Sequence, residues 1–374
     1  MVPTVVYVLY SGDLYGTEQM AIAHLRGLAG KAETVILAPP GLVHQAAAAA
    51  GIRSVVAASK GDVLRETLKI ARRCRRMSLL TTSVTQALVG LAVAALSPWT
   101  RIRHLNICHG GEEAERSFGN KRRLNFTPVR LVAVSSYCAG LLQQFGVPRR
   151  RILVLENFLL DQRIAQAPRR DEGPAPLQAL VACRLVPVKR VDLLVGAVAA
   201  EPRLAGLMET RVLGTGPLLD ELHRTSQGMN FSFEGFRNDV PEVMAQCDVF
   251  VQTWADEPFG LAVVEAMAAG LIVVTPDRGG AAEIVGDESH GLFYRANDPA
   301  SLAQALVRAV EMTPAARAAM RRAAAARAMA RYSVSARHDR LLEVFLGVPS
   351  RPPLGPTSPA RPPPERQWPG TPDC

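Results

Sequence analysis

Residues 249–274 have the sequence VFVQTWADEPFGLAVVEAMAAGLIVV, and this stretch decides the fold. A strand is predicted over residues 249–252, because the first three are apolar and include two valines, as in a strand that is buried on both faces. A helix is predicted from Pro258 to Gly270, because proline suits the first helical position and glycine suits a helix end. A second apolar strand follows at residues 272–274. This succession predicts a parallel sheet covered by helices.

The same alternation of apolar strands and helices extends along most of the chain. In the first part it predicts strands near residues 5–9, 33–37, 53–56, 79–82, 102–107, 131–134 and 152–155. After a break at 157–176 it resumes with strands near 179–183, 210–213, 231–233, 249–252, 272–274 and 291–293. The predicted fold class is therefore α/β, with two doubly wound, Rossmann-like domains that face a central cleft.

The break divides the 374 residues into domains of ordinary size. We expect a first domain over residues 1–165 and a second over 175–330. Helices are predicted from Thr313 to Tyr332 and from Val334 to Leu346, and the part over 331–348 is expected to pack back towards the first domain. Ten of the last 26 residues are proline, so 349–374 are expected to be a disordered tail.

Positive charge is concentrated in the first part of the chain. Residues 1–170 contain 23 Lys/Arg and 10 Asp/Glu, whereas residues 171–348 contain 17 and 22. Part of the excess falls on a basic helix predicted over 63–77, which would carry Arg65, Lys69, Arg72, Arg73, Arg75 and Arg76. The excess indicates either an anionic partner, such as a membrane surface, or simply a solvated basic face. No nucleic-acid partner is expected, because aromatic residues are only 5% of the chain and do not alternate with the arginines.

Other features concern the cellular location. The six cysteines form no C-x-x-C pair, which favours reduced thiols over a disulfide framework or a zinc site. The longest apolar run, residues 87–96, is too short to span a bilayer. We expect a cytoplasmic protein whose contact with the inner face of the membrane, if it has one, is peripheral.

The segment quoted first also contains the densest group of candidate binding residues. Glu257 is predicted to lie near the helix start and Glu265 about two turns further. The N–H groups of Phe259, Gly260 and Leu261 would be available to a ligand, and the two carboxylates could accept hydrogen bonds from sugar hydroxyls. The alternative is that Glu265 is a solvated helix residue and Glu257 a simple N-terminal charge.

Residues 257–285, including Gly279 and Gly280, closely resemble the Glu-x7-Glu signature region of the retaining glycosyltransferases of family 4, which have the GT-B fold. Upstream, CRLVPVKRVD at 183–192 is similar to the family segment whose arginine and lysine bind the donor diphosphate, here Arg184 and Lys189. The resemblance covers essentially residues 178–312 and also includes segments 213–217 and 233–236 and Asp248.

The first domain resembles the same family more loosely. Residues 15–18 (YGTE) resemble a Gly-Gly-x-Glu loop with one glycine replaced, and residues 106–110 (NICHG) resemble a strand that ends in a histidine facing the donor sugar. Asn157 and Asp161 resemble an Asn-Gly-x-Asp hinge, with Phe158 in the glycine place and one extra residue.

The resemblance implies the roles of individual residues. The implied catalytic residues are His109, Arg184, Lys189 and Glu257. The implied donor-binding residues are Gly16, Arg184, Lys189, Gly235, Phe236, Glu257, Phe259, Gly260, Leu261 and Glu265. In these roles Arg184 and Lys189 neutralise the departing diphosphate, Glu265 accepts from ribose hydroxyls, and Glu257 accepts from the transferred sugar. No D-x-D sequence occurs, so neither a metal nor another cofactor is expected.

The function expected from these features is transfer of a hexosyl group from a nucleotide-diphospho-sugar to a hydroxyl acceptor with retention of configuration. The acceptor would be a polysaccharide, a glycolipid or a lipid-linked sugar. A phosphorylase or an epimerase would use the same cleft, and a sugar-nucleotide sensor would keep the site without turnover. A nucleic-acid-binding protein is the alternative from a different class.

Overall fold

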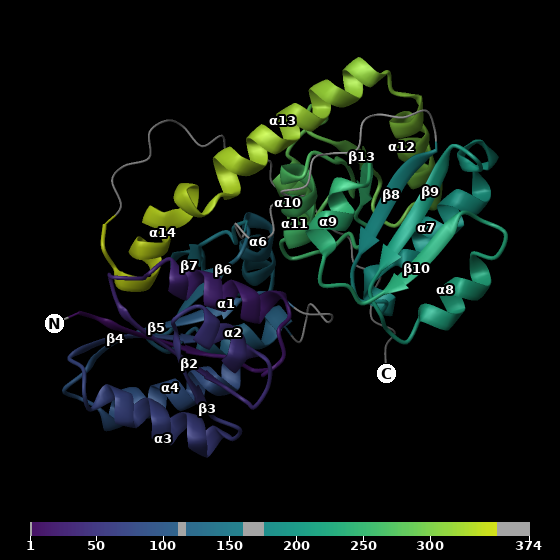
Figure 1. The fold of residues 1–374 in the computed structure, drawn as a ribbon. Coiled ribbons are helices and arrows are strands. Elements are labelled where there is room, and N and C mark those ends of the chain that lie inside the picture. Colours follow the sequence, from purple (N-terminus) through teal and green to yellow (C-terminus); the bar gives the residue numbers. More distant parts are fainter. Residues whose placement is uncertain (1, 111–116, 160–175, 350–374) are drawn as a thin grey trace, which may run out of the picture.

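The computed structural model describes residues 2–110, 117–159 and 176–349. Their strands form two parallel sheets, each with helices on both faces, which confirms the predicted fold class (Figure 1). We call the part built on the first sheet the first lobe and the part built on the second sheet the second lobe. The predicted linker residues 169–174, Gly111, Asp161 and the proline-rich tail from residue 350 lie outside the described residues.

The first sheet has seven strands in the order β3-β2-β1-β4-β5-β6-β7. Consecutive strands after β1 extend to one side and those after β4 to the other, which is the doubly wound arrangement. Because helices cover both faces of the sheet, most of the buried strand residues are apolar. The strands are β1 (Thr4–Val8), β2 (Glu33–Ala38), β3 (Arg53–Val56), β4 (Arg76–Thr81), β5 (Arg101–Cys108), β6 (Arg130–Ala133) and β7 (Ile152–Val154).

Helices α3 (Lys60–Ala71) and α4 (Val84–Leu96) pack together on one face of this sheet, and α1 (Gly16–Arg26) lies on the other (Figure 1). The other helical segments in the described part of the lobe are α2 (Val43–Ala49), η1 (Gly119–Leu124), α6 (Ser136–Gln144) and η2 (Arg149–Arg151).

The basic helix predicted over 63–77 has different bounds. A capping box of Ser59 and Asp62 begins α3 at Lys60, and the helix ends at Ala71. Strand β4 already begins at Arg76, where it pairs with β1 and β5. Pairing within the sheet therefore overrides the helical tendency of the arginines, and only Arg65 and Lys69 of the predicted basic face lie on the helix.

The second sheet has six strands in the order β10-β9-β8-β11-β12-β13. Its strands are β8 (Leu177–Ala182), β9 (Met208–Leu213), β10 (Phe231–Gly235), β11 (Val249–Val251), β12 (Ile272–Pro276) and β13 (Leu292–Tyr294). Its helical segments are η4 (Pro187–Lys189), α7 (Val191–Ala200), η5 (Pro202–Leu204), α8 (Leu219–Thr225), α9 (Val240–Ala245), α10 (Leu261–Ala268), α11 (Gly280–Val285) and α12 (Pro299–Glu311).

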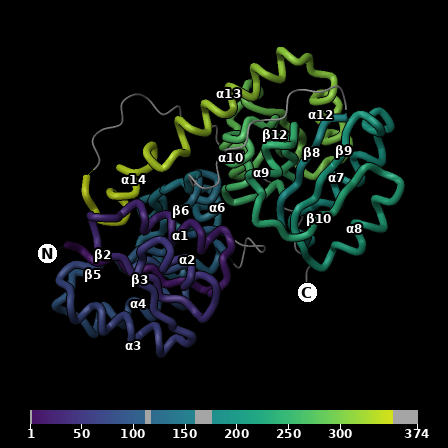
Figure 2. Tube along the Cα trace, in the orientation of Figure 1, coloured from purple at the N-terminus to yellow at the C-terminus, as the bar shows by residue number. Residues whose placement is uncertain are grey.

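The C-terminal helices connect the two lobes. Helix α13 (Pro314–Tyr332) packs on α10 and runs towards the first lobe, and α14 (Val334–Leu346) continues onto it (Figure 2). Ser78 of β4 donates to the Phe345 carbonyl at 2.5 Å, and Arg103 of β5 donates to the Val344 carbonyl at 2.9 Å. Arg103 thereby places a positive charge at the C-terminal end of α14, where the helix dipole is negative.

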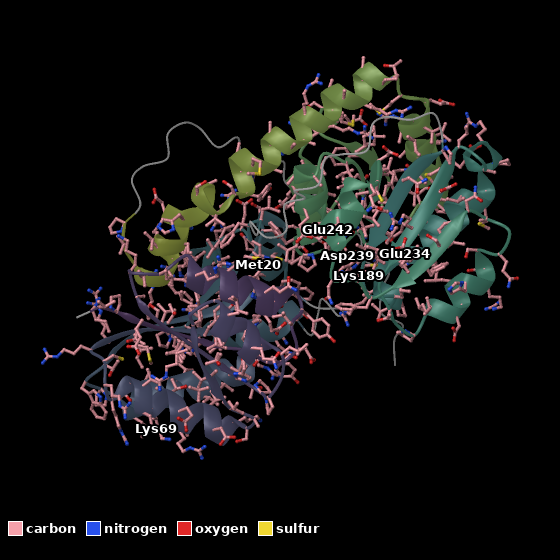
Figure 3. All side chains as sticks on the ribbon, in the orientation of Figure 1. Met20, Lys69, Lys189, Glu234, Asp239 and Glu242 are labelled. Atoms are coloured by element: carbon pink, nitrogen blue, oxygen red, sulfur yellow. The ribbon has the colours of Figure 1, made fainter. Side chains whose placement is uncertain are left out.

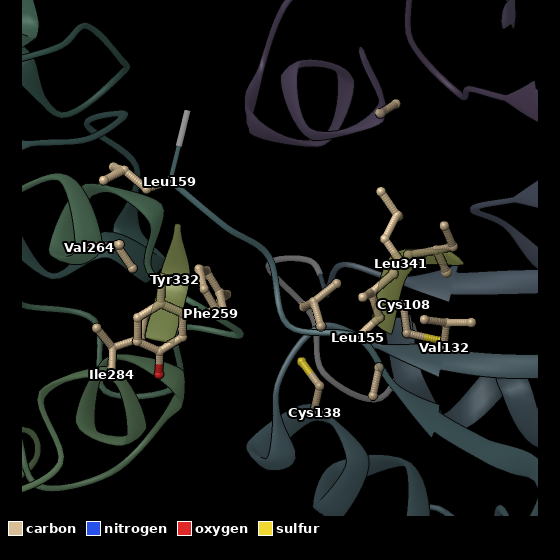
Figure 4. Packing of buried hydrophobic residues seen from close by; sticks show 14 of the residues in the cluster. Cys108, Val132, Cys138, Leu155, Leu159, Phe259, Val264, Ile284, Tyr332 and Leu341 are labelled. Atoms are coloured by element: carbon tan, nitrogen blue, oxygen red, sulfur yellow. The ribbon is translucent and has the colours of Figure 1, made fainter. Parts of the chain in front are cut away.

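The first chain segment that leaves the first lobe lies against the α13–α14 junction. The backbone N–H of Leu159 donates to the Tyr332 carbonyl at 2.7 Å, and Glu156 pairs with Arg331 at 2.9 Å and Arg337 at 2.6 Å. Tyr332 also stacks edge-on against Phe259, with ring centroids 5.7 Å apart, in the buried cluster shown in Figure 4. The two connections between the lobes are therefore bound to each other.

None of the helices in the described part of the chain has the length and apolar character of a membrane-spanning segment. Of the six cysteines, the five in the described ranges carry free thiols.

Candidate functional site

The candidate site lies where the carboxyl ends of the two sheets meet. Loops that follow β1 and β5 approach loops that follow β8 and β11. The Arg184 guanidinium lies 6.0 Å from the centre of the Tyr15 ring, and Gly110 is so close to Pro258 that an added Cβ would be 2.2 Å from Pro258 Cγ. Parallel α/β sheets bind their ligands at this edge.

Lys189 and Glu257 form the central ion pair of the site. Lys189 Nζ lies 2.7 Å from Glu257 Oε2, and each side chain is 18% exposed. The amide of Gln252 donates to the same carboxylate oxygen at 3.3 Å. The family resemblance implied that these two residues meet at one site although 68 positions separate them, and Figure 3 shows Lys189 on the side of the second lobe that faces the first.

Lys189 is held in place by its neighbours. It ends the short helix η4, and Arg190 then adopts a left-handed conformation with φ 52° before α7 begins. Thr253 donates to the Lys189 carbonyl at 2.5 Å. The Lys189 ammonium also lies 4.2 Å from the centre of the Trp254 ring, which is a cation–π contact. The Trp254 ring thus packs against the lysine.

The helix after Glu257 starts later than predicted. It begins at Leu261, not at Pro258, because Gly260 takes φ 108° as the N-cap residue. Gly280 fixes the preceding turn: its N–H donates to the Glu257 carbonyl at 2.7 Å, and an added Cβ would be 2.4 Å from the Pro258 carbonyl oxygen. The N–H of Leu261 remains at the helix start, as predicted, with Phe259 buried behind it.

Glu265 lies one turn into α10, not two turns, because of that later start. It is 5% exposed, so it is not the solvated helix residue of the alternative interpretation.

Arg184 and Gly16 lie at the contact between the lobes. The Arg184 side chain is exposed and faces Tyr15 of the first lobe. Gly16 begins α1, and a Cβ added there would meet Leu261 Cδ1 at 3.5 Å, which is an ordinary contact distance. The approach of the second lobe therefore does not itself require glycine at position 16.

His109 follows β5 and faces Tyr7 of β1, with the Tyr7 hydroxyl 3.1 Å from His109 Nε2. Burial, with a further contribution from Lys121, lowers the pKa of His109 to about 4. Burial raises the pKa of the Tyr7 phenol. His109 is consequently neutral near pH 7 and can act as a hydrogen-bonding group but not as a fixed cation.

Gly235 ends β10, the outermost strand of the second sheet, and Phe236 follows it. Gly235 has φ 68° and its carbonyl accepts from Gly214 at 2.7 Å, while the Phe236 side chain is 74% exposed. Glu234 next to them pairs with Arg211 and Arg237. The ion pairs with the two arginines lower the pKa of the Glu234 carboxyl.

The arginines of the first lobe gather at the opposite edge of their sheet. Strands β3, β4, β5 and β6 each begin with an exposed arginine, and a partly buried arginine directly precedes β7: Arg53, Arg76, Arg101, Arg130 and Arg151. We call this row the arginine edge. It lies at the amino ends of the strands, whereas the site lies at their carboxyl ends. In Figure 3, Lys69 of α3 is likewise far from Lys189.

Sequence analysis did not identify the first-lobe residues that touch the Glu257 loop. Tyr137 donates to Asp256 Oδ1 at 2.6 Å and Ser135 donates to the Pro258 carbonyl at 2.6 Å. The available signal was the strand predicted near residues 131–134, because the segment that follows the carboxyl end of a parallel strand faces the cleft.

Comparison with known proteins gives a match to one family model, described as "Glycosyl transferases group 1", over residues 177–312. The chain is 29% identical over 171 residues to a Campylobacter jejuni enzyme named N-acetylgalactosamine-N,N'-diacetylbacillosaminyl-diphospho-undecaprenol 4-alpha-N-acetylgalactosaminyltransferase, covering 44% of this chain and 46% of the relative. It is 28% identical over 233 residues to a Mycobacterium tuberculosis GDP-mannose-dependent alpha-mannosyltransferase, covering 59% and 54%. The chain thus spans about half the length of the curated relatives it matches.

The fold extends further than the sequence similarity. The crystal structure of Anabaena Alr3699/HepE in complex with UDP and glucose is similar with a TM-score of 0.78, at 21% identity, over 92% of this chain and 100% of that one. The expected family resemblance is confirmed. The second lobe matches the group 1 glycosyltransferase family model, and the chain as a whole has the GT-B fold.

Proposed function

We propose that the protein transfers a hexosyl group from a nucleotide-diphospho-sugar to a hydroxyl acceptor, with retention of configuration and without a metal ion. The observation that carries this proposal is the Lys189–Glu257 pair, 2.7 Å apart at the cleft edge of the second sheet. A cation for the diphosphate and a carboxylate for the sugar are thereby held side by side. Arg184 adds a second cation on the side of the first lobe.

The two cations address the charge that develops on the leaving group. When the bond between the anomeric carbon and the phosphate oxygen breaks, negative charge grows on the diphosphate. Arg184 offers a planar fork for phosphate oxygens, and Lys189 offers a compact charge that Glu257 and Trp254 already hold in position. The helix start at Leu261 contributes N–H dipoles. These groups do not need to reorganise during the reaction.

Retention follows from attack on the same face from which the diphosphate leaves. The acceptor oxygen forms its bond to the anomeric carbon as the phosphate oxygen departs, and that phosphate oxygen takes the acceptor proton. Glu257 is engaged by Lys189, which suits a hydrogen-bond acceptor for the transferred sugar better than a covalent nucleophile. Buried Glu265 is assigned to the ribose hydroxyls, and neutral His109 to a sugar hydroxyl.

The acceptor is assigned to the first lobe, as a hydroxyl of a polysaccharide or of a lipid-linked sugar. The names of relatives support this class: one acts on a diphospho-undecaprenol and another is a putative colanic acid biosynthesis glycosyltransferase of Escherichia coli, 29% identical over 189 residues.

A panel of UDP-, GDP- and ADP-sugars tests the proposal. One donor should raise the unfolding temperature, and release of its nucleoside diphosphate should accelerate with a hydroxyl acceptor present. Nuclear magnetic resonance of the product should show the anomeric configuration of the donor. Binding without release would instead indicate a sugar-nucleotide sensor, and inversion would contradict the proposed mechanism.

The proposal includes a cytoplasmic protein that contacts an anionic membrane through the arginine edge. Exposed aromatic side chains accompany these arginines: Trp99 precedes β5 and is 54% exposed, and Phe126 is fully exposed before β6. Basic residues near such a surface contribute about 1 kcal/mol each. The protein should float with liposomes that contain phosphatidylglycerol but not with phosphatidylcholine alone, and high salt should release it. Failure to float would mean that the edge is merely solvated.

A further inference from the structure

The first lobe binds both sequence neighbours of Glu257. Tyr137 donates its hydroxyl to Asp256 Oδ1 at 2.6 Å, and Ser135 donates to the Pro258 carbonyl at 2.6 Å. Both donors belong to the start of α6, which follows β6 of the first sheet. The catalytic carboxylate of the second lobe therefore lies between two contacts made by the first.

The local structure of α6 makes these contacts possible. Ser135 is the N-cap residue with φ −159°, and its hydroxyl accepts from the Cys138 N–H at 2.9 Å while it donates to Pro258. The next N–H, of Ser136, donates to Glu283 Oε2 at 3.0 Å. A carboxylate of the second lobe thus satisfies a free N–H of a first-lobe helix, where the helix dipole is positive.

Asp256 is shared between the two lobes. Besides Tyr137, it contacts Arg278 of its own lobe, whose Nη2 lies 3.2 Å from Asp256 Oδ2. On the other side of Glu257 the Pro258 carbonyl is buried under Ser135 and next to Gly280. The backbone of Glu257 is consequently fixed on both sides, and only its side chain is left to face Lys189.

We propose that Tyr137 is a positioning residue for the transfer reaction and acts on Glu257 through Asp256. The inference rests on the proposed function, because Glu257 matters here as the group that contacts the transferred sugar. Tyr137 itself contacts no reacting atom. Its phenol fixes the 256–258 turn from the opposite lobe, so that the carboxylate stays in register with Lys189.

The variant Tyr137→Phe tests this role with the loss of one hydroxyl. Loss of a hydrogen bond to a charged group should lower the rate of transfer about tenfold. Affinity for the nucleotide sugar should fall, whereas affinity for the free nucleoside diphosphate should change by less than about twofold, because the sugar contact alone is displaced. Tyr332→Phe is the matched control. The Tyr332 hydroxyl is also buried, and it has no hydrogen-bond partner among the described residues. The control should behave as the wild type.

Hydrogen–deuterium exchange provides a readout that does not depend on turnover. The backbone amides of residues 255–257, 259 and 260 should exchange faster in Tyr137→Phe than in the wild type or in Tyr332→Phe, at an unchanged unfolding temperature. In a double-mutant cycle, Tyr137→Phe should have little further effect on exchange or transfer once Asp256→Ala is present.

Two results would overturn the positioning role. One is that exchange and transfer are unchanged in Tyr137→Phe, and the other is that Tyr137→Phe has the same effect on them in the wild type as in Asp256→Ala. Absence of sugar-nucleotide binding by the wild type is a different outcome. It would refute the proposed function, and the exchange data would still decide whether Tyr137 holds the turn.

Discussion

Two lysine–glutamate pairs of similar length occupy different environments. Lys69 and Glu66 are 2.9 Å apart on the outer surface of α3, one helical turn from each other, and Lys69 is 56% exposed. Lys189 and Glu257 are 2.7 Å apart, but they come from different loops and each is 18% exposed. The first pair is formed within one helix and its lysine is exposed to water, whereas the tertiary structure brings the second pair together. The comparison shows that distance alone does not distinguish a site from a surface pair.

The largest difference should appear when each lysine is removed. Lys189→Ala should lower transfer roughly 10²- to 10³-fold, because one fixed donor to the leaving group is lost. Lys69→Ala should leave the rate within about twofold, since surface pairs contribute little. Steady-state kinetics with the best donor would check both. Equal losses in the two variants would show that the pairs do not differ in function.

A second test moves Glu257 without altering its charge. In Gly280→Ala the new Cβ would meet the Pro258 carbonyl oxygen at 2.4 Å, so the turn that carries Glu257 must shift. We expect about 1–3 kcal/mol lower stability in urea unfolding, as for overpacked cores, and a loss of transfer. Gly140→Ala is the control, because an added Cβ at Gly140 meets nothing within 4 Å. A fully active Gly280→Ala variant would contradict a fixed turn.

The contact of Glu283 with the first lobe, close to the deeper pair's turn, should appear as a pH dependence. Burial raises the pKa of Glu283 to about 7, with Glu156 adding to the rise and the Ser136 N–H and Arg331 opposing it. A raised folded-state pKa gives stability that is complete below the ordinary value near 4.5 and is lost as pH rises through 7. Glu283→Gln, which stays neutral, should therefore gain in unfolding temperature relative to the wild type between pH 5 and pH 8. A constant difference over this range would contradict the raised pKa.

The smallest effect is expected within the α3 pair itself. Hydrogen bonds from Lys69 and Arg65 lower the pKa of Glu66, but both of these cations are more than half exposed to water. A double-mutant cycle of Lys69→Ala and Glu66→Ala, followed by urea unfolding, should give a coupling within experimental error. A large coupling there would remove the contrast with Lys189 and Glu257.

The fold could be predicted because apolar strands alternate with helices, and a strand buried on both faces has a distinctive composition. The first and last residues of the helices could be predicted less accurately. The start at Leu261 depends on the positive φ of Gly260 and on the Gly280 hydrogen bond, which are tertiary features. The basic helix was predicted too long because strand pairing at Arg76 cannot be inferred from local propensity.

The proximity of Lys189 and Glu257 was predicted through the family resemblance, and their roles remain predictions. The contact of Tyr137 with Asp256 could not be predicted, because 119 positions separate the residues and neither belongs to a recognised motif. The alignment of the arginines in the arginine edge could not be predicted from the sequence either. Their spacing along the chain matches no helix, and only strand pairing brings them into one row.

The bond between Leu159 and Tyr332 has a consequence for movement. Leu159 is the last described residue before the first connection and Tyr332 ends the helix that makes the second, so we expect any hinge motion between the lobes to centre on this hydrogen bond. Phe259 touches Tyr332 there and lies next to Pro258, so the turn that carries Glu257 sits close to this point. The Glu257 carboxylate would then move least if the lobes opened.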